Sequence, residues 1–330
     1  MRLRLSFIIP ALFMAFIALG AASYKTILIG TIFAMAFAYG VFKGEETPWK
    51  EKEFKFIKEE YLLWAFLISL LLVLLQILII GKVPLLDSSA RHLLSPHLTA
   101  LTYFLGVPSS VYLFSKGNKY ALAYPILVAL YGYRTPVLVS FLAFGAAYFE
   151  RIELRPKHFA GFSLLILAGF VGIALARGET LSAQLFRIQA TTSVLDVIME
   201  RAPWHGFYHG HLQWAGIRSY IVGGYSPRGL VARFLYVKTG VSITPTLLGG
   251  MYLDFGLFSI IEGFLLGMYY GMISKAKNLL LKVIYYTTLA YGVVGVETGI
   301  LDLPVYLFFF AGIYALIRGK YSIRVVKVAE

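Results

Sequence analysis

Long apolar runs limit the folds open to this chain. Many of them approach the roughly 17–20 residues that a helix needs to cross a bilayer about 30 Å thick. Hydrophobic residues make up 59% of the 330, and charged residues only 14%, whereas a soluble domain is nearer half apolar and a quarter charged. In a soluble bundle, too many of these helices would be apolar on every face. We therefore predict an all-α, polytopic membrane protein with a single membrane domain over residues 1–330.

About ten spans are predicted, with one large loop over residues 177–245 between spans seven and eight. The spans are Leu5–Ala22, Thr26–Phe42, Tyr61–Ile80, Leu98–Phe114, Tyr120–Tyr131, Pro136–Phe149, Phe159–Ala176, Thr246–Ile273, Leu279–Val294 and Ile300–Ile317.

The positions of lysine and arginine indicate the orientation. The chain has 30 of them, and 19 fall in segments that are cytoplasmic if the N-terminus is inside. Four fall in the short outer connections and seven in the large loop. Short cytoplasmic loops carry such an excess, and long loops are largely exempt. We expect a multi-pass protein of the plasma membrane, with both termini in the cytoplasm and the large loop on the extracytoplasmic side.

Composition also excludes several classes of function. The net charge of +13 follows from the loop bias, so we expect membrane lipid and no nucleic acid as a partner. The chain has no cysteine, which excludes disulfides, thiolate metal sites and cysteine nucleophiles. It also lacks a glycine-rich phosphate loop, which argues against transport driven by ATP.

The large loop combines a predicted helix with a cluster of histidines. From Thr180 to Glu200, apolar residues recur at spacings of three, four and seven, which predicts an amphipathic helix on the outer bilayer surface or packed on the spans. His205, His209 and His211 then follow within seven residues, in a stretch where proline and glycine break regular structure.

Arginines gather on the predicted outer face. Arg91 and Arg134 lie in short outer connections, and Arg218 and Arg228 lie in the large loop. One interfacial arginine is usually explained by pairing with lipid headgroups. Several on one face favour an anionic ligand, and the planar guanidinium binds phosphate bidentately. The pattern predicts a site for a phosphate or diphosphate carried by a lipid.

The histidines have three interpretations. A neutral histidine near an acceptor hydroxyl can act as a general base. The spacing of His205 and His209 also permits a metal site, but no carboxylate is interleaved as in zinc peptidases, and we expect no metal. The third interpretation, interfacial side chains among aromatic residues, stays open.

Two carboxylates interrupt the eighth predicted span. Ionisable groups at membrane depth are costly and often functional. Asp254 lies about 13 Å deep at 1.5 Å per residue, and we expect it to face a cavity that opens outward as a further catalytic candidate. Glu262 lies nearer the cytoplasm, and we expect it to pair with a basic neighbour.

Two segments resemble a known family. Thr244–Gly256 resembles the segment after the large outer loop of oligosaccharide repeat-unit polymerases, the O-antigen-polymerase-like membrane glycosyltransferases of GT-C type, which are related to O-antigen ligases. Tyr131–Pro136 resembles their earlier arginine-bearing connection. The layout agrees over nearly the whole chain, with ten or more spans and one large outer loop late in the sequence.

A spacing pattern adds to this resemblance. Members often carry an arginine followed eleven positions later by glycine in outer loops, and Arg218 with Gly229 and Arg134 with Gly145 fit it. The related ligases use a histidine of the large loop, to which one of the three histidines here would correspond.

The resemblance implies a metal-independent, inverting glycosyl transfer on the outer face, without a cofactor. The donor would be a growing glycan on polyprenyl diphosphate, and the acceptor a second lipid-linked repeat unit. The arginines would hold the diphosphate, and a histidine or carboxylate would deprotonate the acceptor hydroxyl. A flippase or a chain-length regulator would be the expected protein partner.

Two alternatives remain. A ligase would use the same donor and transfer the glycan to a different acceptor. A flippase for a lipid-linked glycan would belong to another class, the transporters, and would show internal symmetry and broken helices in matching halves. The sequence shows neither feature.

Overall fold

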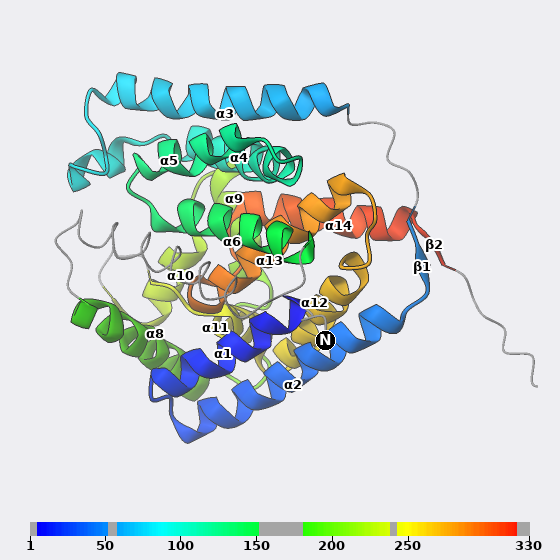
Figure 1. The fold of residues 1–330 in the computed structure, drawn as a ribbon. Coiled ribbons are helices and arrows are strands. Elements are labelled where there is room, and N and C mark those ends of the chain that lie inside the picture. Colours follow the sequence, from blue (N-terminus) through cyan, green and yellow to red (C-terminus); the bar gives the residue numbers. More distant parts are fainter. Residues whose placement is uncertain (1–4, 52–57, 152–180, 238–242, 322–330) are drawn as a thin grey trace, which may run out of the picture.

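The computed structural model describes residues 5–51, 58–151, 181–237 and 243–321. Figure 1 shows the arrangement of their helices. The α-helices are α1 (Ile8–Leu19), α2 (Tyr24–Glu46), α3 (Glu59–Ile80), α4 (Pro96–Ser115), α5 (Ala123–Ala129), α6 (Arg134–Arg151), α8 (Leu181–Arg201), α9 (His211–Ile221), α10 (Pro227–Phe234), α11 (Leu247–Phe255), α12 (Ser259–Ile273), α13 (Leu279–Thr298) and α14 (Leu303–Arg318).

Short segments complete the described structure. Four 3-10 turns cover Leu5–Phe7, Ser88–Leu93, Lys119–Leu122 and Gly256–Phe258. In the described ranges, β-structure is confined to a two-residue antiparallel pair, β1 (Trp49–Lys50) and β2 (Lys320–Tyr321).

The all-α, multi-pass prediction is confirmed. Nine of the ten predicted spans coincide with described helices, and the seventh, Phe159–Ala176, lies outside the described residues. Within the described part of the chain, five helical segments are long and apolar enough to cross a membrane. They are Tyr24–Glu46, Glu59–Ile80, Pro96–Ser115, Leu247–Ile273 and Leu279–Thr298. Three predicted spans coincide with shorter apolar helices, at Leu5–Leu19, Lys119–Ala129 and Leu303–Arg318.

Helix α13 lies at the centre of the bundle and α3 at its edge. Of the most apolar window of each, 72% of the residues in α13 and 22% of those in α3 are buried, and α3 runs along one side of the molecule in Figure 1. A helix that is apolar all round must be buried in protein or face lipid. The exposed apolar side chains of α3 are therefore its lipid-facing surface.

The eighth predicted span is not one helix, which corrects the uninterrupted helix expected over Thr246–Ile273. Helix α11 ends at Phe255, and α12 begins at Ser259 after a 3-10 turn. Gly256 has φ 56° and ψ −130°, a conformation that favours glycine. A Cβ there would lie 1.9 Å from the carbonyl oxygen of Trp204. The close approach of the large loop therefore explains the break.

Glycines bring α2 and α12 into backbone contact. Gly40 on α2 lies against Phe264, and Gly267 on α12 lies against Phe37; a Cβ on either glycine would lie 2.1 Å from a carbonyl oxygen of the other helix. Gly44 and Gly271 make similar contacts one turn further on. Small residues four apart allow such close packing in membranes. Later residues of α2 contact later residues of α12, so the two helices run parallel. Spans two and eight are both predicted to run from the outer face to the cytoplasm, which requires the same direction.

We expect Gly267→Ala to lower the melting temperature of the purified protein, because its Cβ would force α2 and α12 apart. The expected loss of stability is about 1–3 kcal/mol, the usual range for overpacking. Gly250→Ala is the control, since a Cβ there would meet its nearest atom at 3.5 Å. Thermal unfolding in detergent, followed by tryptophan fluorescence, measures both. Equal melting temperatures for the two variants would contradict the backbone contact.

The large loop is anchored at one end of the bundle. Helix α8 occupies Leu181–Arg201, where the sequence predicts a helix over Thr180–Glu200. Its Asp196 accepts hydrogen bonds from the backbone N–H of Ser23 at 2.9 and 3.1 Å. Lys25 donates to the carbonyl oxygen of Met199 at 2.5 Å. Helix α8 therefore lies against the turn between α1 and α2, and this end of the bundle carries the sites described next.

Candidate functional site

The histidine segment is attached to the break between α11 and α12. The backbone N–H groups of Phe207 and Tyr208 donate to the carbonyl oxygen of Leu253 at 2.7 and 2.9 Å, and that of His209 donates to the carbonyl oxygen of Asp254 at 2.9 Å. Gly206, with φ 88°, lies so close that a Cβ would be 2.2 Å from the same Asp254 oxygen. These contacts hold the segment Trp204–His211 against a membrane-spanning element.

Asp254 holds the start of α9 in place. Its side chain is fully buried. One carboxylate oxygen accepts from the backbone N–H of Gly210 and Leu212 at 3.0 and 2.9 Å, and the other accepts from that of Gln213 at 2.8 Å. The first N–H groups of a helix have no partner inside the helix and carry partial positive charge. The carboxylate therefore caps α9 from another element, and it does not line the cavities described below.

The three predicted histidines are exposed. The rings of His205 and His209 stack, with centroids 5.3 Å apart and planes at 14°. His209 has a positive φ of 50°, a conformation that is uncommon outside glycine and occurs at functional sites. Within the described ranges, no group of three His, Asp or Glu side chains is placed to hold a metal ion.

His209 and His211 line a pocket of about 420 Å³ together with Arg218. Tyr208 and Tyr225 contribute aromatic walls to it. The hydroxyl of Tyr208 donates to the carbonyl oxygen of Leu230 at 2.9 Å, which ties the histidine segment to α10. We call this the histidine pocket.

A second pocket, of about 400 Å³, contains Arg228 and Asp302. We call it the arginine pocket. Nη2 of Arg228 lies 2.8 Å from Oδ2 of Asp302, and the nearby carboxylate raises the pKa of Arg228 above its usual value. The buried Nε of Arg228 has no hydrogen-bond partner among the described residues. The guanidinium is thus held through Nη2, and its Nε is buried beside the pocket without a partner.

Tyrosines form much of the wall of the arginine pocket. They come from four separate places in the chain, namely Tyr103, Tyr133, Tyr220 and Tyr291. Burial, with a smaller contribution from Asp302, raises the pKa of Tyr220 to about 12, so this phenol stays protonated at neutral pH and can donate a hydrogen bond. Aromatic faces and hydroxyls together suit a ligand with both polar and apolar surfaces.

The structure separates the four predicted arginines. Arg134 is the first residue of α6 and stands between Tyr133 and Thr135, which line the arginine pocket with Arg228. Arg91 approaches the same connection, since a Cβ on Gly132 would lie 2.8 Å from its Nε. Of these three arginines, only Arg228 lines the pocket, and Arg91 and Arg134 lie at the neighbouring connection.

Arg218 belongs to the histidine pocket instead. The two pockets share α9 and α10 as a wall, because Tyr220 and Arg228 line one, and Arg218 and Leu230 line the other.

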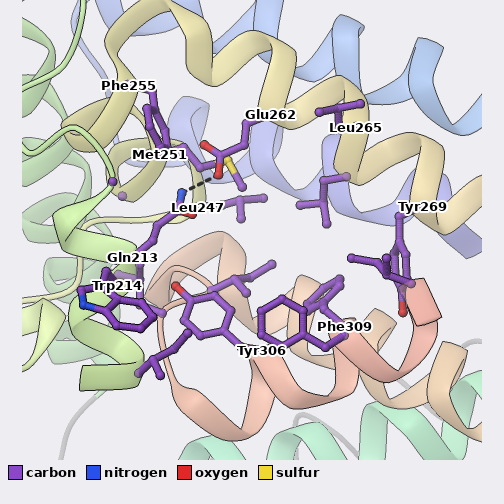
Figure 2. A pocket seen from close by; sticks show the side chains of 18 residues that line it. Gln213, Trp214, Leu247, Met251, Phe255, Glu262, Leu265, Tyr269, Tyr306 and Phe309 are labelled. Atoms are coloured by element: carbon purple, nitrogen blue, oxygen red, sulfur yellow. Dashed lines mark hydrogen bonds between the residues drawn. The ribbon is translucent and has the colours of Figure 1, made fainter. Parts of the chain in front are cut away.

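A third cavity, of about 470 Å³, lies between α9, α11, α12 and α14. Figure 2 shows Glu262 entering it from α12 and Tyr306 from α14. Gln213 donates a short hydrogen bond to Oε1 of Glu262. The expectation that Glu262 pairs with a basic neighbour is therefore wrong within the described residues, since its partner is an amide of α9.

Sequence reasoning missed several of these residues. Asp302 fell within the predicted tenth span and had no role. Of the lining tyrosines only Tyr133 belonged to a recognised segment, Tyr131–Pro136, and Gln213 and Tyr306 carried no motif. The best available indication was Asp302 itself, an ionisable residue inside a predicted span and two residues before Pro304 at the start of α14, because such residues are often functional.

Comparison with known protein families shows which family the chain belongs to. The family model described as "Putative O-antigen polymerase" matches residues 2–309, nearly the whole chain. The chain belongs to this family. The predicted relationship to O-antigen polymerases is thus confirmed, and a glycosyltransferase-like role in a membrane is the general function that the family suggests.

Two curated relatives of this O-antigen polymerase family member come from Methanocaldococcus jannaschii. One is 28% identical over 285 residues, which cover 80% of this chain and 79% of the relative. The other is 26% identical over 244 residues, which cover 72% of this chain and 60% of the relative. Both are named as uncharacterized proteins. No solved structure gives a significant match.

Proposed function

We propose that this protein polymerises oligosaccharide repeat units carried on polyprenyl diphosphate, at the extracytoplasmic face of the membrane. The observation that carries the proposal is the arginine pocket. Arg228 there keeps a buried, unpartnered Nε, and Arg134 and Arg91 lie in the adjoining connections. Membership of the O-antigen polymerase family supplies the class of reaction.

The arginine pocket suits a diphosphate. Asp302 fixes the position of the Arg228 guanidinium, so little side-chain entropy remains to be lost when an anion binds to it. Arginine recognises phosphate oxygens through parallel N–H donors. Because the pocket is partly enclosed, these interactions are stronger than they would be in water. The lining tyrosines provide hydroxyl donors and ring faces for the first sugars.

The proposed reaction is a direct displacement. The acceptor hydroxyl attacks the anomeric carbon of the donor glycan, its proton passes to a base, and the bond to polyprenyl diphosphate breaks with inversion at that carbon. The arginines stabilise the negative charge on the leaving diphosphate. The reaction needs no metal or nucleotide sugar in this scheme.

We favour His209 or His211 as the base, and keep His205 as a candidate. Both favoured histidines open onto the histidine pocket beside Arg218, and the shared wall of α9 and α10 places this pocket next to the arginine pocket. Asp254, with three backbone N–H groups bound to its oxygens, is proposed as a positioning residue for this segment rather than as the base.

The proposed orientation places both termini in the cytoplasm. It is supported by the contacts at the opposite end of the bundle from α8. There β1, just after α2, pairs with β2, just after α14, as expected if spans two and ten both end on the cytoplasmic side. A flippase would supply substrate to the outer face, and a chain-length regulator is the other proposed partner.

The test is an assay of purified protein in nanodiscs with a polyprenyl-diphosphate-linked repeat unit and EDTA. We expect a ladder of longer lipid-linked glycans at the rate seen without EDTA. Loss of the ladder in EDTA would contradict the metal-independent mechanism. Transfer of glycan only to an added second acceptor would identify a ligase. Movement of labelled lipid across the bilayer without lengthening would identify a flippase and reject the polymerase.

A further inference from the structure

The cavity of Figure 2 contains two polar atoms without partners. Oε2 of Glu262 and the hydroxyl of Tyr306 are both buried and have no hydrogen-bond partner within the described structure. A buried polar group without a partner costs free energy, and a carboxylate oxygen costs more than a neutral one. Both residues line the same cavity. A ligand that forms a hydrogen bond with either atom would therefore recover part of this cost.

The rest of the wall is apolar. Leucine, isoleucine, methionine and aromatic side chains from four helices provide most of it, and it includes no lysine, arginine or histidine. A volume of about 470 Å³ lies in the range of pockets that enclose a small organic ligand. Most of the ligand must therefore be apolar, and the ligand can carry only a small polar group.

The cavity opens toward the surface that would face lipid. Leu265 of α12 and Phe310 and Ile313 of α14 line it and are 56%, 53% and 41% exposed. Helix α12 belongs to a candidate span and α14 is an apolar helix. A ligand can therefore enter sideways from the bilayer.

We propose that this cavity binds a lipid alcohol, an isoprenoid or acyl chain that ends in a hydroxyl. A hydroxyl is both donor and acceptor, so it can donate to Oε2 of Glu262 or accept from the hydroxyl of Tyr306. A phosphate in the same place would meet the carboxylate of Glu262 in a medium of low dielectric, where like charges repel strongly.

This lipid-alcohol site is separate from the diphosphate site of the proposed function. Gly216 of α9 packs against the start of α14, where a Cβ would lie 2.3 Å from the carbonyl oxygen of Leu301. The cavity lies on one side of this contact and is lined by Gln213 and Tyr306. The arginine pocket lies on the other side and is lined by Tyr220 and Asp302. The inference does not depend on glycosyl transfer.

The experiment uses purified full-length protein in phosphatidylcholine nanodiscs with a diazirine analogue of farnesol. We expect photolabelling of α12 and α14, mapped by mass spectrometry. Unlabelled farnesol should compete at least about 10-fold better than farnesyl phosphate, the factor expected for one hydrogen bond to a charged group. Dodecanol in place of farnesol tests whether an acyl alcohol also fits.

Matched variants test the geometry. Ile313→Trp should block the mouth and lower labelling at least about 5-fold, a loss of roughly 1 kcal/mol. Ile317→Trp, one turn further along α14 and exposed, should not. Glu262→Gln should narrow the preference for farnesol over farnesyl phosphate, because the repelling charge is gone, but a preference should remain because the wall offers the phosphate no cation.

Three results would each overturn the proposal. They are labelling spread evenly over the lipid-facing helices, equal competition by farnesyl phosphate in the unaltered protein, and unchanged labelling in Ile313→Trp. The probes carry no sugar, so failure here leaves the polymerase proposal standing, and failure of the polymerase assay leaves this site standing.

Discussion

Replacing Arg228 by alanine is expected to reduce polymer formation at least about 100-fold, the usual cost of removing one preorganised donor to a developing charge. The reason is the position of its guanidinium, which is held by Asp302 at 2.8 Å and keeps a buried Nε donor beside the arginine pocket. Arg228→Lys should recover only part of the activity, because an ammonium lacks the planar fork. The measurement is the ladder of lipid-linked glycans per unit time.

The control separates binding from folding. Arg228→Ala leaves Asp302 without its partner, which by itself destabilises the protein. The double variant Arg228→Ala with Asp302→Ala removes both charges, so it should regain stability and remain inactive. Arg233→Ala, on the exposed side of α10, should keep full activity. A double variant as active as the unaltered protein would show that Arg228 serves only the fold.

Asp254→Ala is expected to destabilise the protein by about 3 kcal/mol or more, because it leaves three backbone N–H groups of the α9 start without an acceptor. The histidine segment should loosen with it, and activity should fall in parallel. Asp254→Asn should be intermediate, since an amide offers one acceptor oxygen and places an NH2 group against N–H donors. Thermal unfolding in detergent measures stability, and proteolysis between Trp204 and His211 reports on the segment.

Asp87→Asn is the matched control. Asp87 also accepts a backbone N–H, from Ser89 at 2.9 Å, but at an exposed turn. Hydrogen bonds from Ser89 and the ammonium of Lys82 lower its pKa to about 2. This carboxylate is therefore ionised at neutral pH, and its replacement should leave the melting temperature nearly unchanged. An Asp254→Asn variant with a normal melting temperature and no activity would instead assign Asp254 as the base.

Local patterns predicted the spans, because hydropathy is a property of consecutive residues. The helix at Leu181–Arg201 follows from the same kind of periodicity. The break at Gly256 could not be read this way, since it arises from a contact with Trp204 of the large loop. The segment is apolar throughout, but its helix is broken between Phe255 and Ser259.

The sites depended on contacts between distant residues. Arg228 and Asp302 are 74 positions apart, and Asp254 meets residues 41 to 44 positions before it. The sequence grouped the arginines by their predicted side of the membrane, which is why Arg218 was joined to residues of a different pocket. It also treated a carboxylate within a span as a candidate for catalysis. In the structure, the carboxylate of Asp254 has a different role, since it accepts hydrogen bonds from backbone N–H groups at the start of α9.

The glycine contact between α2 and α12 also affects how the protein is made. Gly40 leaves the ribosome more than 200 residues before Gly267, which at about 5–20 residues per second corresponds to roughly 10–45 s of synthesis. Until α12 has been made, the glycine face of α2 has no helix to pack against, and only lipid or an insertion factor can cover it. Assembly of this membrane protein therefore waits for its last third, and a chain that stops before Ser259 leaves the glycine face of α2 without its partner helix, although α1 still packs on another face of α2.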